Sequence, residues 1–250
     1  MSIIRKVYFK LLIFCYNENG DGMEQKKGKL IVIEGACDGI GKSTQYNLLY
    51  DKLISLGYKV INHHFPSYNT FHGAPVEKYL AGDFGRIDEL SPYFINSLYA
   101  IDRASAWYLN LKREYESGAL ILLDRYTTSS IIYQAATVTP LEKRKKFIDD
   151  ICDYEYNKLE IAKPDMVIFL EAPFDMVTNL RNNRQDYEGN ANDIHERDLA
   201  FMRQVYDNAI FVADYLKWTK IKCNRDDEMK NVDEIHETIL KKVLKKMNHN

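Results

Sequence analysis

A glycine-rich stretch near the N-terminus carries the residue types best suited to hold phosphate. The sequence IEGACDGIGKSTQ spans residues 33–45 and contains the triplet Gly41-Lys42-Ser43. In such a loop, backbone N–H groups at the start of a helix point at phosphate oxygens, and the helix dipole favours anions. The lysine adds a point charge at the outer phosphates, and the serine hydroxyl is a ligand for Mg²⁺. The pattern predicts an ATP-binding loop made by Gly39, Ile40, Gly41, Lys42, Ser43 and Thr44.

The spacing of this loop departs from the usual pattern G-x-x-x-x-G-K-[ST]. The residue five places before Gly41 is Ala36, and the expected glycine comes one place earlier, as Gly35. We expect the extra residue to lie between Gly35 and Asp38, so that only the N-terminal shoulder of the loop bulges. The helix-proximal N–H groups would then keep their phosphate contacts. Cys37 lies in this shoulder, and we interpret it as a tolerated small residue rather than a reactive thiol.

A phosphate loop requires a buried strand before it and a helix after it. The stretch KLIVIEG, residues 29–35, is a continuous run of mainly branched apolar residues, typical of a buried parallel strand. After Lys42, apolar residues recur at helical spacing up to a plausible stop at Gly57. The local pattern therefore predicts strand, loop and helix in the required order.

Strands and helices alternate along the rest of the chain. Further strands are predicted at 58–65, 118–126, 163–173 and 218–224, and helices at roughly 90–116, 126–136, 140–160, 173–184, 194–216 and 231–247. This alternation predicts an α/β fold with a doubly wound, five-stranded parallel sheet flanked by helices. No internal repeat and no obvious linker interrupts it.

Ligands of such sheets bind beyond the carboxyl ends of the strands, and polar or turn residues stand there in this sequence. Phe65-Pro66 follows the second predicted strand, and Asp124-Arg125-Tyr126 follows the third. Guanidinium groups match phosphate geometry, so Arg103 and Arg125 are candidates for a phosphate on the acceptor. A phosphate loop opposite such arginines indicates phosphoryl transfer to an acceptor that is itself anionic.

Five motifs together resemble the thymidylate kinase family, which has the nucleoside monophosphate kinase fold. They are DGIGKSTQ in the loop, FP at residues 65–66, YAIDRASAW at 99–107, DRYTTSSIIYQ at 124–134, and PDMVIFLEAP followed by LRNNR. The resemblance covers about residues 29–239, and the order and spacing of the motifs make it specific.

The resemblance implies transfer of a phosphoryl group from Mg·ATP to dTMP, giving ADP and dTDP, by a homodimeric enzyme. It assigns dTMP contacts to Asp38, Phe65, Pro66, Tyr99, Arg103, Arg125, Ser130, Tyr133 and Gln134. Tyr99 stands where the family stacks an aromatic ring on thymine, and Arg125 where it binds the acceptor phosphate. Ser43 and Asp124 would lie at the Mg²⁺ ion, and Asp38 and Asp124 would assist Lys42 in catalysis. Many relatives have Gly or Asn in place of Ser130. The preference for dTMP over other acceptors is therefore the property most open to differ from the family's.

A mobile lid would complete the catalytic set. Relatives place a catalytic arginine either in the phosphate loop or in the lid, and here Gly39 occupies the loop position. The family pattern therefore assigns the charge to a lid at about 181–195, with Arg184 as first choice and Arg181 as second, as in bacterial-like members. The polar, glycine-containing sequence of this segment is typical of a lid.

Composition limits the partners. The chain has 250 residues, a formal net charge of -2, 46% hydrophobic and 28% charged residues. No global basic field indicates nucleic-acid or membrane binding, and four scattered cysteines favour a reducing, cytoplasmic compartment. Residues 1–22 combine a basic start with a short apolar run that is too short to span a membrane. We interpret them as an extension, with a peripheral anchor as the alternative, and residues 23–250 as one kinase domain.

Several alternatives stay open at this point. Arg103 could be a solvated helix charge, Tyr99 a core aromatic, and the two lid arginines ordinary surface charges. His195 is interpreted as a surface or capping residue, and His63 and His64 as structural. A deoxynucleoside kinase would need a carboxylate base after the second strand, where Phe65-Pro66 stands instead. A catalytically silent nucleotide-binding relative is the remaining alternative, favoured only by the unusual loop.

Overall fold

A parallel five-stranded sheet forms the centre of the molecule. The computed structural model describes residues 27–86, 89–182 and 199–248. The strands are β1 (Lys29–Gly35), β2 (Val60–His64), β3 (Leu120–Asp124), β4 (Met166–Glu171) and β5 (Thr219–Lys222). They are ordered β2-β3-β1-β4-β5, and every neighbouring pair is parallel. The predicted fold class and all five predicted strands are confirmed.

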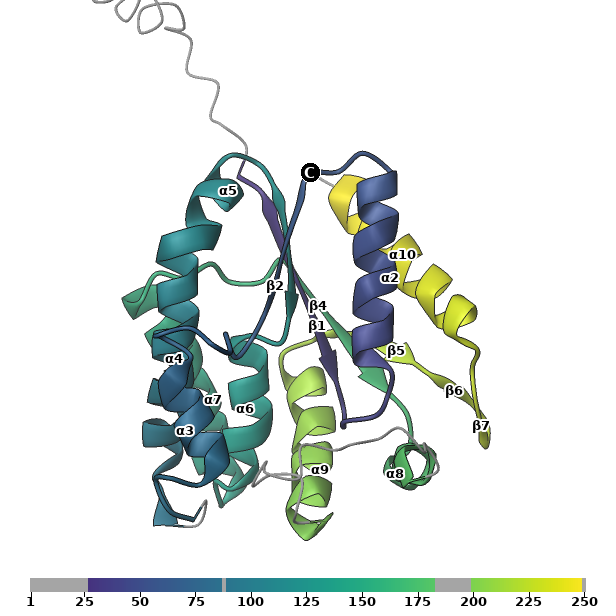
Figure 1. The fold of residues 1–250 in the computed structure, drawn as a ribbon. Coiled ribbons are helices and arrows are strands. Elements are labelled where there is room, and N and C mark those ends of the chain that lie inside the picture. The colour runs from purple at the N-terminus through teal and green to yellow at the C-terminus, as the bar shows by residue number, and fades with distance from the viewer. Residues whose placement is uncertain (1–26, 87–88, 183–198, 249–250) are drawn as a thin grey trace, which may run out of the picture.

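Helices pack on both faces of this sheet (Figure 1). They are α2 (Lys42–Ser55), α3 (Ala74–Ala81), α4 (Pro92–Ala106), α5 (Lys112–Glu116), α6 (Thr127–Ala136), α7 (Leu141–Asp153), α8 (Phe174–Asn182), α9 (Leu199–Tyr215) and α10 (Val232–Asn248). Two π-helical segments, η2 (Trp107–Leu111) and η3 (Tyr154–Lys158), and a small hairpin of β6 (Asn224–Arg225) and β7 (Glu228–Met229) complete the described elements.

Three local features differ from the sequence prediction. Helix α3 was not predicted, although Pro75 in its first turn and Gly82 in a left-handed conformation after its last residue are ordinary boundary signals. The single helices predicted over 90–116 and 140–160 are interrupted by η2 and η3. A π turn holds an extra residue, which shifts the buried positions without breaking the apolar pattern from which a helix is predicted.

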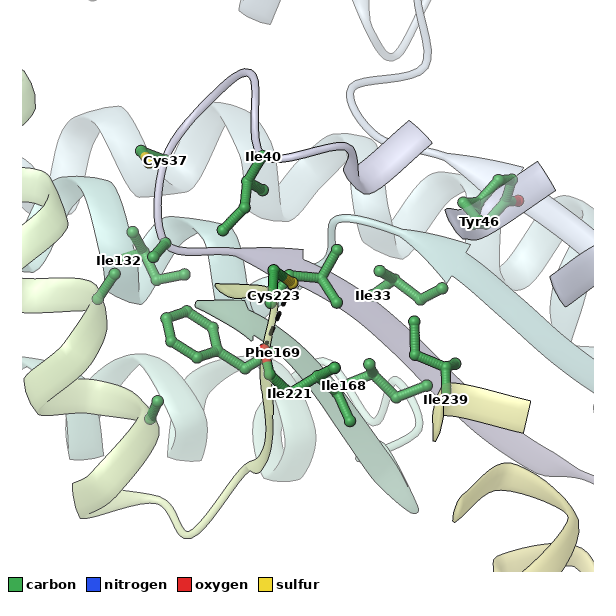
Figure 2. Packing of buried hydrophobic residues seen from close by; sticks show 14 of the residues in the cluster. Ile33, Cys37, Ile40, Tyr46, Ile132, Ile168, Phe169, Ile221, Cys223 and Ile239 are labelled. Atoms are coloured by element: carbon green, nitrogen blue, oxygen red, sulfur yellow. Dashed lines mark hydrogen bonds between the residues drawn. The ribbon is translucent and has the colours of Figure 1, made fainter. Parts of the chain in front are cut away.

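The side chains of β1 alternate between two apolar cores. Ile31 and Ile33 join the cluster under α2, α9 and α10, whereas Leu30 and Val32 join the cluster under α4 and η2. All four side chains are fully buried, as expected for a strand covered on both faces. Figure 2 shows the first of these clusters directly beneath the loop that follows β1. The strand that leads into the loop is therefore held rigidly on both sides.

None of the described helices is long and apolar enough to cross a membrane.

Candidate active site

The loop between β1 and α2 is built on the apolar core. Ala36, Cys37 and Ile40 are buried, and the amide of Ala36 donates to the carbonyl of Leu170 on β4 at 2.9 Å. A Cβ atom at Gly35 would lie 2.8 Å from Cγ2 of Ile40, so a glycine is needed where the loop leaves the strand. Figure 2 shows Ile40 reaching from the loop toward this core. The N-terminal shoulder, in which the extra residue is predicted to lie, is thus packed against the core.

The helix-proximal half of the loop faces open space. Gly41 has a φ of 91°, which favours glycine, and a Cβ atom there would meet nothing within 4 Å. Lys42 begins α2, and the side chains of Ser43 and Thr44 are exposed. A helix N-terminus with an open approach is suited to receive an anion.

Lys42 lies beside the ends of the two neighbouring strands. Its Nζ donates to Oδ1 of Asp124, and Nδ1 of His64 lies 3.0 Å from Oδ2 of the same carboxylate. His64 and Asp124 are register partners at the carboxyl ends of β2 and β3. Burial alone would raise the pKa of Asp124, but the bond with His64 and the charge of Lys42 lower it. The carboxylate is therefore held in its ionised form.

Arg125 and Asp38 form a second ionic contact, between β3 and the loop. Nη2 of Arg125 donates to Oδ1 of Asp38 at 2.7 Å, and the Tyr133 hydroxyl donates to Oδ2 at 3.0 Å. Burial opposes ionisation of Asp38, but the charges of Arg125 and Lys42 lower its pKa. The backbone φ of Arg125 is 65°, a strained value for a residue with a Cβ atom. Such strain is most frequent at functional sites.

Arg103 belongs to a fully buried cluster between α4, α6 and η3. Its guanidinium donates to both carboxylate oxygens of Glu155, from Nε at 2.7 Å and from Nη2 at 2.6 Å. Nη2 also donates to Ser130 at 2.9 Å and to Asn96 at 3.3 Å. Arg103 is 1% exposed, so it is not a solvated helix charge.

Asp38, Arg125 and Arg103 line one pocket of about 240 Å³. Every residue predicted to contact dTMP lines it: Asp38, Phe65, Pro66, Tyr99, Arg103, Arg125, Ser130, Tyr133 and Gln134. Asp38 and Arg125 lie at the end near the phosphate loop. The opposite end holds Arg103 and the buried amide of Gln134, whose Oε1 has no hydrogen-bond partner in the part of the chain that the structure describes. The pocket thus has an ion pair at one end, and at the other an arginine that is already paired and an amide oxygen that is not.

Tyr99 forms part of the wall of this pocket. It is half-buried, and its ring packs edge-on against Tyr79 at 6.1 Å between centroids. The guanidinium of Arg103 lies 5.9 Å from the centre of the Tyr99 ring. Tyr99 is therefore only partly buried, and it lines the pocket.

The strand end that carries Phe65-Pro66 is fixed by hydrogen bonds to α4. Oδ2 of Asp102 accepts a bond from the amide of Ser67 at 2.8 Å, and its Oδ1 lies 2.7 Å from Nδ1 of His72. Asp102 is fully buried and directly precedes Arg103. Helix α4 therefore positions two sides of the pocket at once.

A fully buried carboxylate, Glu34, lies behind the pocket. Its Oε1 accepts bonds from the hydroxyls of Thr128 and Ser129, both at 2.6 Å, whereas Oε2 has no partner among the described residues. Burial raises the pKa of Glu34, although the charge of Arg125 opposes the shift. Glu34 thus ties the end of β1 to the first turn of α6, which carries Ser130.

A cavity of about 610 Å³, larger than the pocket described above, lies away from the phosphate loop. It is lined by residues at the start of β4 and β5, among them Met166 and Thr219, and by lysines near the end of α10. Ligands of doubly wound sheets bind at the carboxyl ends of the strands, and this cavity lies at the amino ends. The smaller pocket, which has the loop and the arginines, is therefore the candidate active site.

The predicted lid lies mostly outside the described residues. The backbone of Arg181 belongs to α8, but its side chain is not described, and Arg184 and His195 fall outside the described ranges. Their predicted roles stay predictions.

The residues predicted to bind the acceptor lie together in one pocket, but three polar groups around them were not assigned roles from the sequence. His64 was interpreted as structural, yet it lines the pocket and contacts Asp124. Its place just before Phe65-Pro66, at a strand end, was the signal. Glu34 and Glu155 were not predicted to have roles. Glu34 directly precedes the loop, but nothing in the polar run around Glu155 indicates that this carboxylate turns inward.

The fold and the site together define a class of protein. A phosphate loop lies at the end of the central strand of a doubly wound sheet, and a pocket with an arginine at each end opens beside it. This combination is that of a P-loop kinase whose acceptor carries its own phosphate.

Comparison with known proteins specifies the family. Residues 33–239 match the thymidylate kinase family, so the chain belongs to that family and is a nucleoside monophosphate kinase that phosphorylates dTMP to dTDP. It is 29% identical over 224 residues to the thymidylate kinase of Plasmodium falciparum, covering 89% of this chain and 92% of that protein. A probable thymidylate kinase of Caldivirga maquilingensis is 30% identical over 174 residues, covering 69% of this chain and 75% of the relative.

A solved structure has the same fold. The thymidylate kinase of Candida albicans superposes with a TM-score of 0.65 at 22% sequence identity, covering 90% of this chain and 94% of that one.

Proposed function

We propose that the described pocket is the dTMP site of this thymidylate kinase and that the loop after β1 holds Mg·ATP. The observation that supports this proposal best is the composition of the pocket. It combines an Arg125–Asp38 pair beside the loop with an unpaired, buried amide oxygen on Gln134 at the far end. A nucleotide with phosphate at one end and a hydrogen-bonding base at the other matches that polarity.

The donor side uses the open half of the loop. The backbone N–H groups of residues 39–44 and the ammonium of Lys42 would hold the β- and γ-phosphates of ATP. Lys42 would turn partly away from Asp124 and toward the phosphates. Burial and repulsion by Arg125 lower the pKa of Lys42, and the negative charge of the phosphates would favour its protonated form.

The acceptor phosphate would bind the guanidinium of Arg125, beside the carboxylate of Asp38. That guanidinium contacts Asp38 through Nη2 alone and packs over the ring of Tyr133 at 5.5 Å, which leaves other N–H groups for a phosphate oxygen. Asp38 and the Tyr133 hydroxyl would then face the sugar of dTMP. Both phosphates would be held in line across Lys42 and Arg125, as phosphoryl transfer requires.

The base would be recognised by hydrogen-bond pattern. Thymine presents an N3–H donor beside an O4 acceptor. The unpaired Oε1 of Gln134 would accept from N3–H, and a guanidinium N–H of Arg103 would donate to O4. Tyr99, Phe65 and Pro66 would pack against the thymine ring. The Ser130 hydroxyl would keep accepting its hydrogen bond from Nη2 of Arg103.

Mg²⁺ fits the oxygen groups next to the loop. Asp124 offers an ionised carboxylate, and Ser43 offers an exposed hydroxyl one residue after Lys42. Together with phosphate oxygens and water they form the hard donor set that Mg²⁺ prefers. When bound, the ion neutralises charge on the β- and γ-phosphates.

Three further assignments are part of the proposal. Arg184, or failing that Arg181, supplies the lid charge, since Gly39 leaves the loop without an arginine. Residues 1–22 lie outside the kinase unit, for which Gly28 makes an early anchor: its amide donates to the Tyr115 carbonyl at 2.7 Å. The enzyme acts in the cytoplasm, where ATP and reduced thiols are found.

The proposal includes a homodimer through α4 and η2. Phe94, Ile101 and Tyr108 recur every seven residues along these segments and are 38%, 52% and 50% exposed. Large apolar side chains in one row on a helix surface form a surface suited to a second copy. Sedimentation measurements would test the assembly.

The decisive experiment is ADP release from Mg·ATP by the full chain with dTMP, dUMP, dCMP, AMP, GMP or thymidine as acceptor. We expect dTMP to be preferred. Preference for thymidine would instead support a deoxynucleoside kinase. ATP binding without turnover on any acceptor would support a silent relative and overturn the proposal.

A further inference from the structure

The base end of the acceptor pocket depends on a carboxylate that does not line it. Glu155 accepts Nε of Arg103 on Oε2 at 2.7 Å and Nη2 on Oε1 at 2.6 Å. Oε2 also accepts the hydroxyl of Thr127 at 2.8 Å. Arg103 lines the pocket, whereas Glu155 and Thr127 do not. Glu155 therefore reaches the pocket only through Arg103.

This ion pair fixes the guanidinium in one orientation. A guanidinium has five N–H donors in a planar fork, and two parallel bonds to a carboxylate determine the plane and the rotation of that fork. Nε and Nη2 are committed to Glu155, with Nη2 also bonded to Ser130. Nη1 makes only a long contact of 3.4 Å with the Tyr126 carbonyl. Nη1 is thus the nitrogen with an N–H to spare.

The pair also cancels the charge of the arginine. The side chains of Arg103 and Glu155 are 2% and 0% exposed, so water does not screen either of them. The charge of Glu155 therefore acts on Arg103 at full strength, and the base end presents a neutral pair. The acceptor phosphate is then drawn to Arg125, at the other end of the pocket, whose pair with Asp38 has a single contact and is partly exposed.

The local fold of the chain turns Glu155 inward. It is the second residue of η3, and its neighbour Tyr154 is 42% exposed while Glu155 is fully buried. The sequence around it, DYEYNK, is polar and reads as a solvated helix end. π turns of this kind occur frequently at functional sites.

We propose that Glu155 is the positioning residue for base recognition: it orients Arg103 so that Nη1 donates to the O4 oxygen of the acceptor base, and it neutralises that arginine. The inference rests on the proposed dTMP site. It assigns the discrimination between a base with an acceptor at position 4, as in thymine and uracil, and a base with an amino group there, as in cytosine. Without Glu155, the guanidinium of Arg103 would rotate freely and keep its net charge. It would then discriminate less strictly between an oxygen and an amino group at position 4 of the base.

The test compares the full chain with its Glu155→Gln variant. Gln has the same shape but no charge, and its NH₂ group cannot accept from a guanidinium. We expect KM for dTMP to rise about tenfold and the ratio of kcat/KM for dTMP over dCMP to fall about tenfold, each the loss of one oriented hydrogen bond. KM for ATP and kcat with saturating dTMP should stay within about threefold, since the reacting phosphates are held elsewhere. Asp153→Asn, an exposed carboxylate on the preceding helix, is the matched control and should change none of these values.

The readouts separate positioning from a merely structural role. A Glu155→Gln variant with a lower Tm but an unchanged dTMP-to-dCMP ratio would overturn the inference. If that variant does not fold, Thr127→Val removes one bond to Glu155 and should lower the ratio in the same direction, by a smaller factor; an unchanged ratio there would also overturn it. If the unsubstituted chain itself shows no preference for dTMP, the proposed function fails first, and that result is distinct from loss of preference in the variant alone.

Discussion

Two arginines line the proposed acceptor pocket, and the arginine–carboxylate pairs that they form differ in burial. At the phosphate end, the side chains of Arg125 and Asp38 are 22% and 23% exposed and share one contact of 2.7 Å. At the base end, those of Arg103 and Glu155 are 2% and 0% exposed and share two. A partly exposed pair has little to lose by opening, whereas a buried pair cannot be separated without leaving a charge stranded. The first pair is therefore suited to bind an incoming phosphate and the second to stay fixed.

The same comparison separates affinity from stability. Residues at the phosphate end should affect turnover and binding with little effect on folding. Residues at the base end should affect both. Substitutions at Lys42, Arg103 and Arg125 test this division. A substitution at Glu34 tests how a buried carboxylate without an ion pair affects the free energy of unfolding.

The largest effect is expected from Lys42→Ala at the phosphate end. The substitution removes a charge that stabilises the transferred phosphoryl group, so kcat should fall about 10³-fold or more. The fold should persist, because Lys42 lies at the start of α2 and Asp124 keeps its contact with His64. Steady-state kinetics and a thermal melt measure both quantities. Lys52→Ala, an exposed lysine on the same helix, is the control; normal turnover in Lys42→Ala would contradict the assignment of the loop.

The second effect tests the stability half of the comparison directly. Arg103→Met should lower the free energy of unfolding by about 3–5 kcal/mol, because it leaves Glu155 charged and buried without its partner. Arg125→Met should lower it by about 1 kcal/mol or less, as is typical of a partly exposed pair. Urea unfolding of the two variants side by side gives the difference. Equal losses would mean that the two pairs do not differ as their burial indicates.

A third effect tests the affinity half. Arg125→Ala should raise KM for dTMP about 10–100-fold, since a charge-assisted bond to phosphate is lost and Asp38 stays behind as a repelling charge. KM for ATP should change by less than about threefold. Initial-rate kinetics with each substrate varied in turn separates the two constants. A rise confined to the ATP constant would mean that the donor and acceptor sides are reversed.

The sequence predicted the phosphate end more completely than the base end. Strand β1, its loop and the residues Asp124 and Arg125 follow from local patterns, because a buried strand and a helix start are encoded by neighbouring residues. The pocket residues came from the resemblance to a family. Glu155 could not be predicted from the sequence, because its burial depends on a π turn and on the packing of three helices around Arg103. Long-range pairing of this kind leaves no short-range signal.

Glu34 differs from Asp38 and Glu155 because it makes no ion pair with any described residue. Its ordinary pKa of 4.5 is raised, chiefly by burial, so the folded chain binds this proton more tightly than the unfolded chain. The contribution of Glu34 to stability is therefore present below about pH 4.5 and is lost as the pH rises through the raised value. Gln at this position accepts the same two hydroxyl bonds and binds no proton.

The difference in unfolding free energy between Glu34→Gln and the unsubstituted chain should therefore shift in favour of the variant as the pH rises from about 4.5 towards neutrality. Urea unfolding at a series of pH values measures it, with Glu142→Gln as the exposed control whose difference should stay flat. The opposite trend would mean that Arg125 and Lys42 compensate Glu34 through space. Glu34 would then belong with the paired carboxylates, and the ionic network at the phosphate end would extend behind the loop into β1.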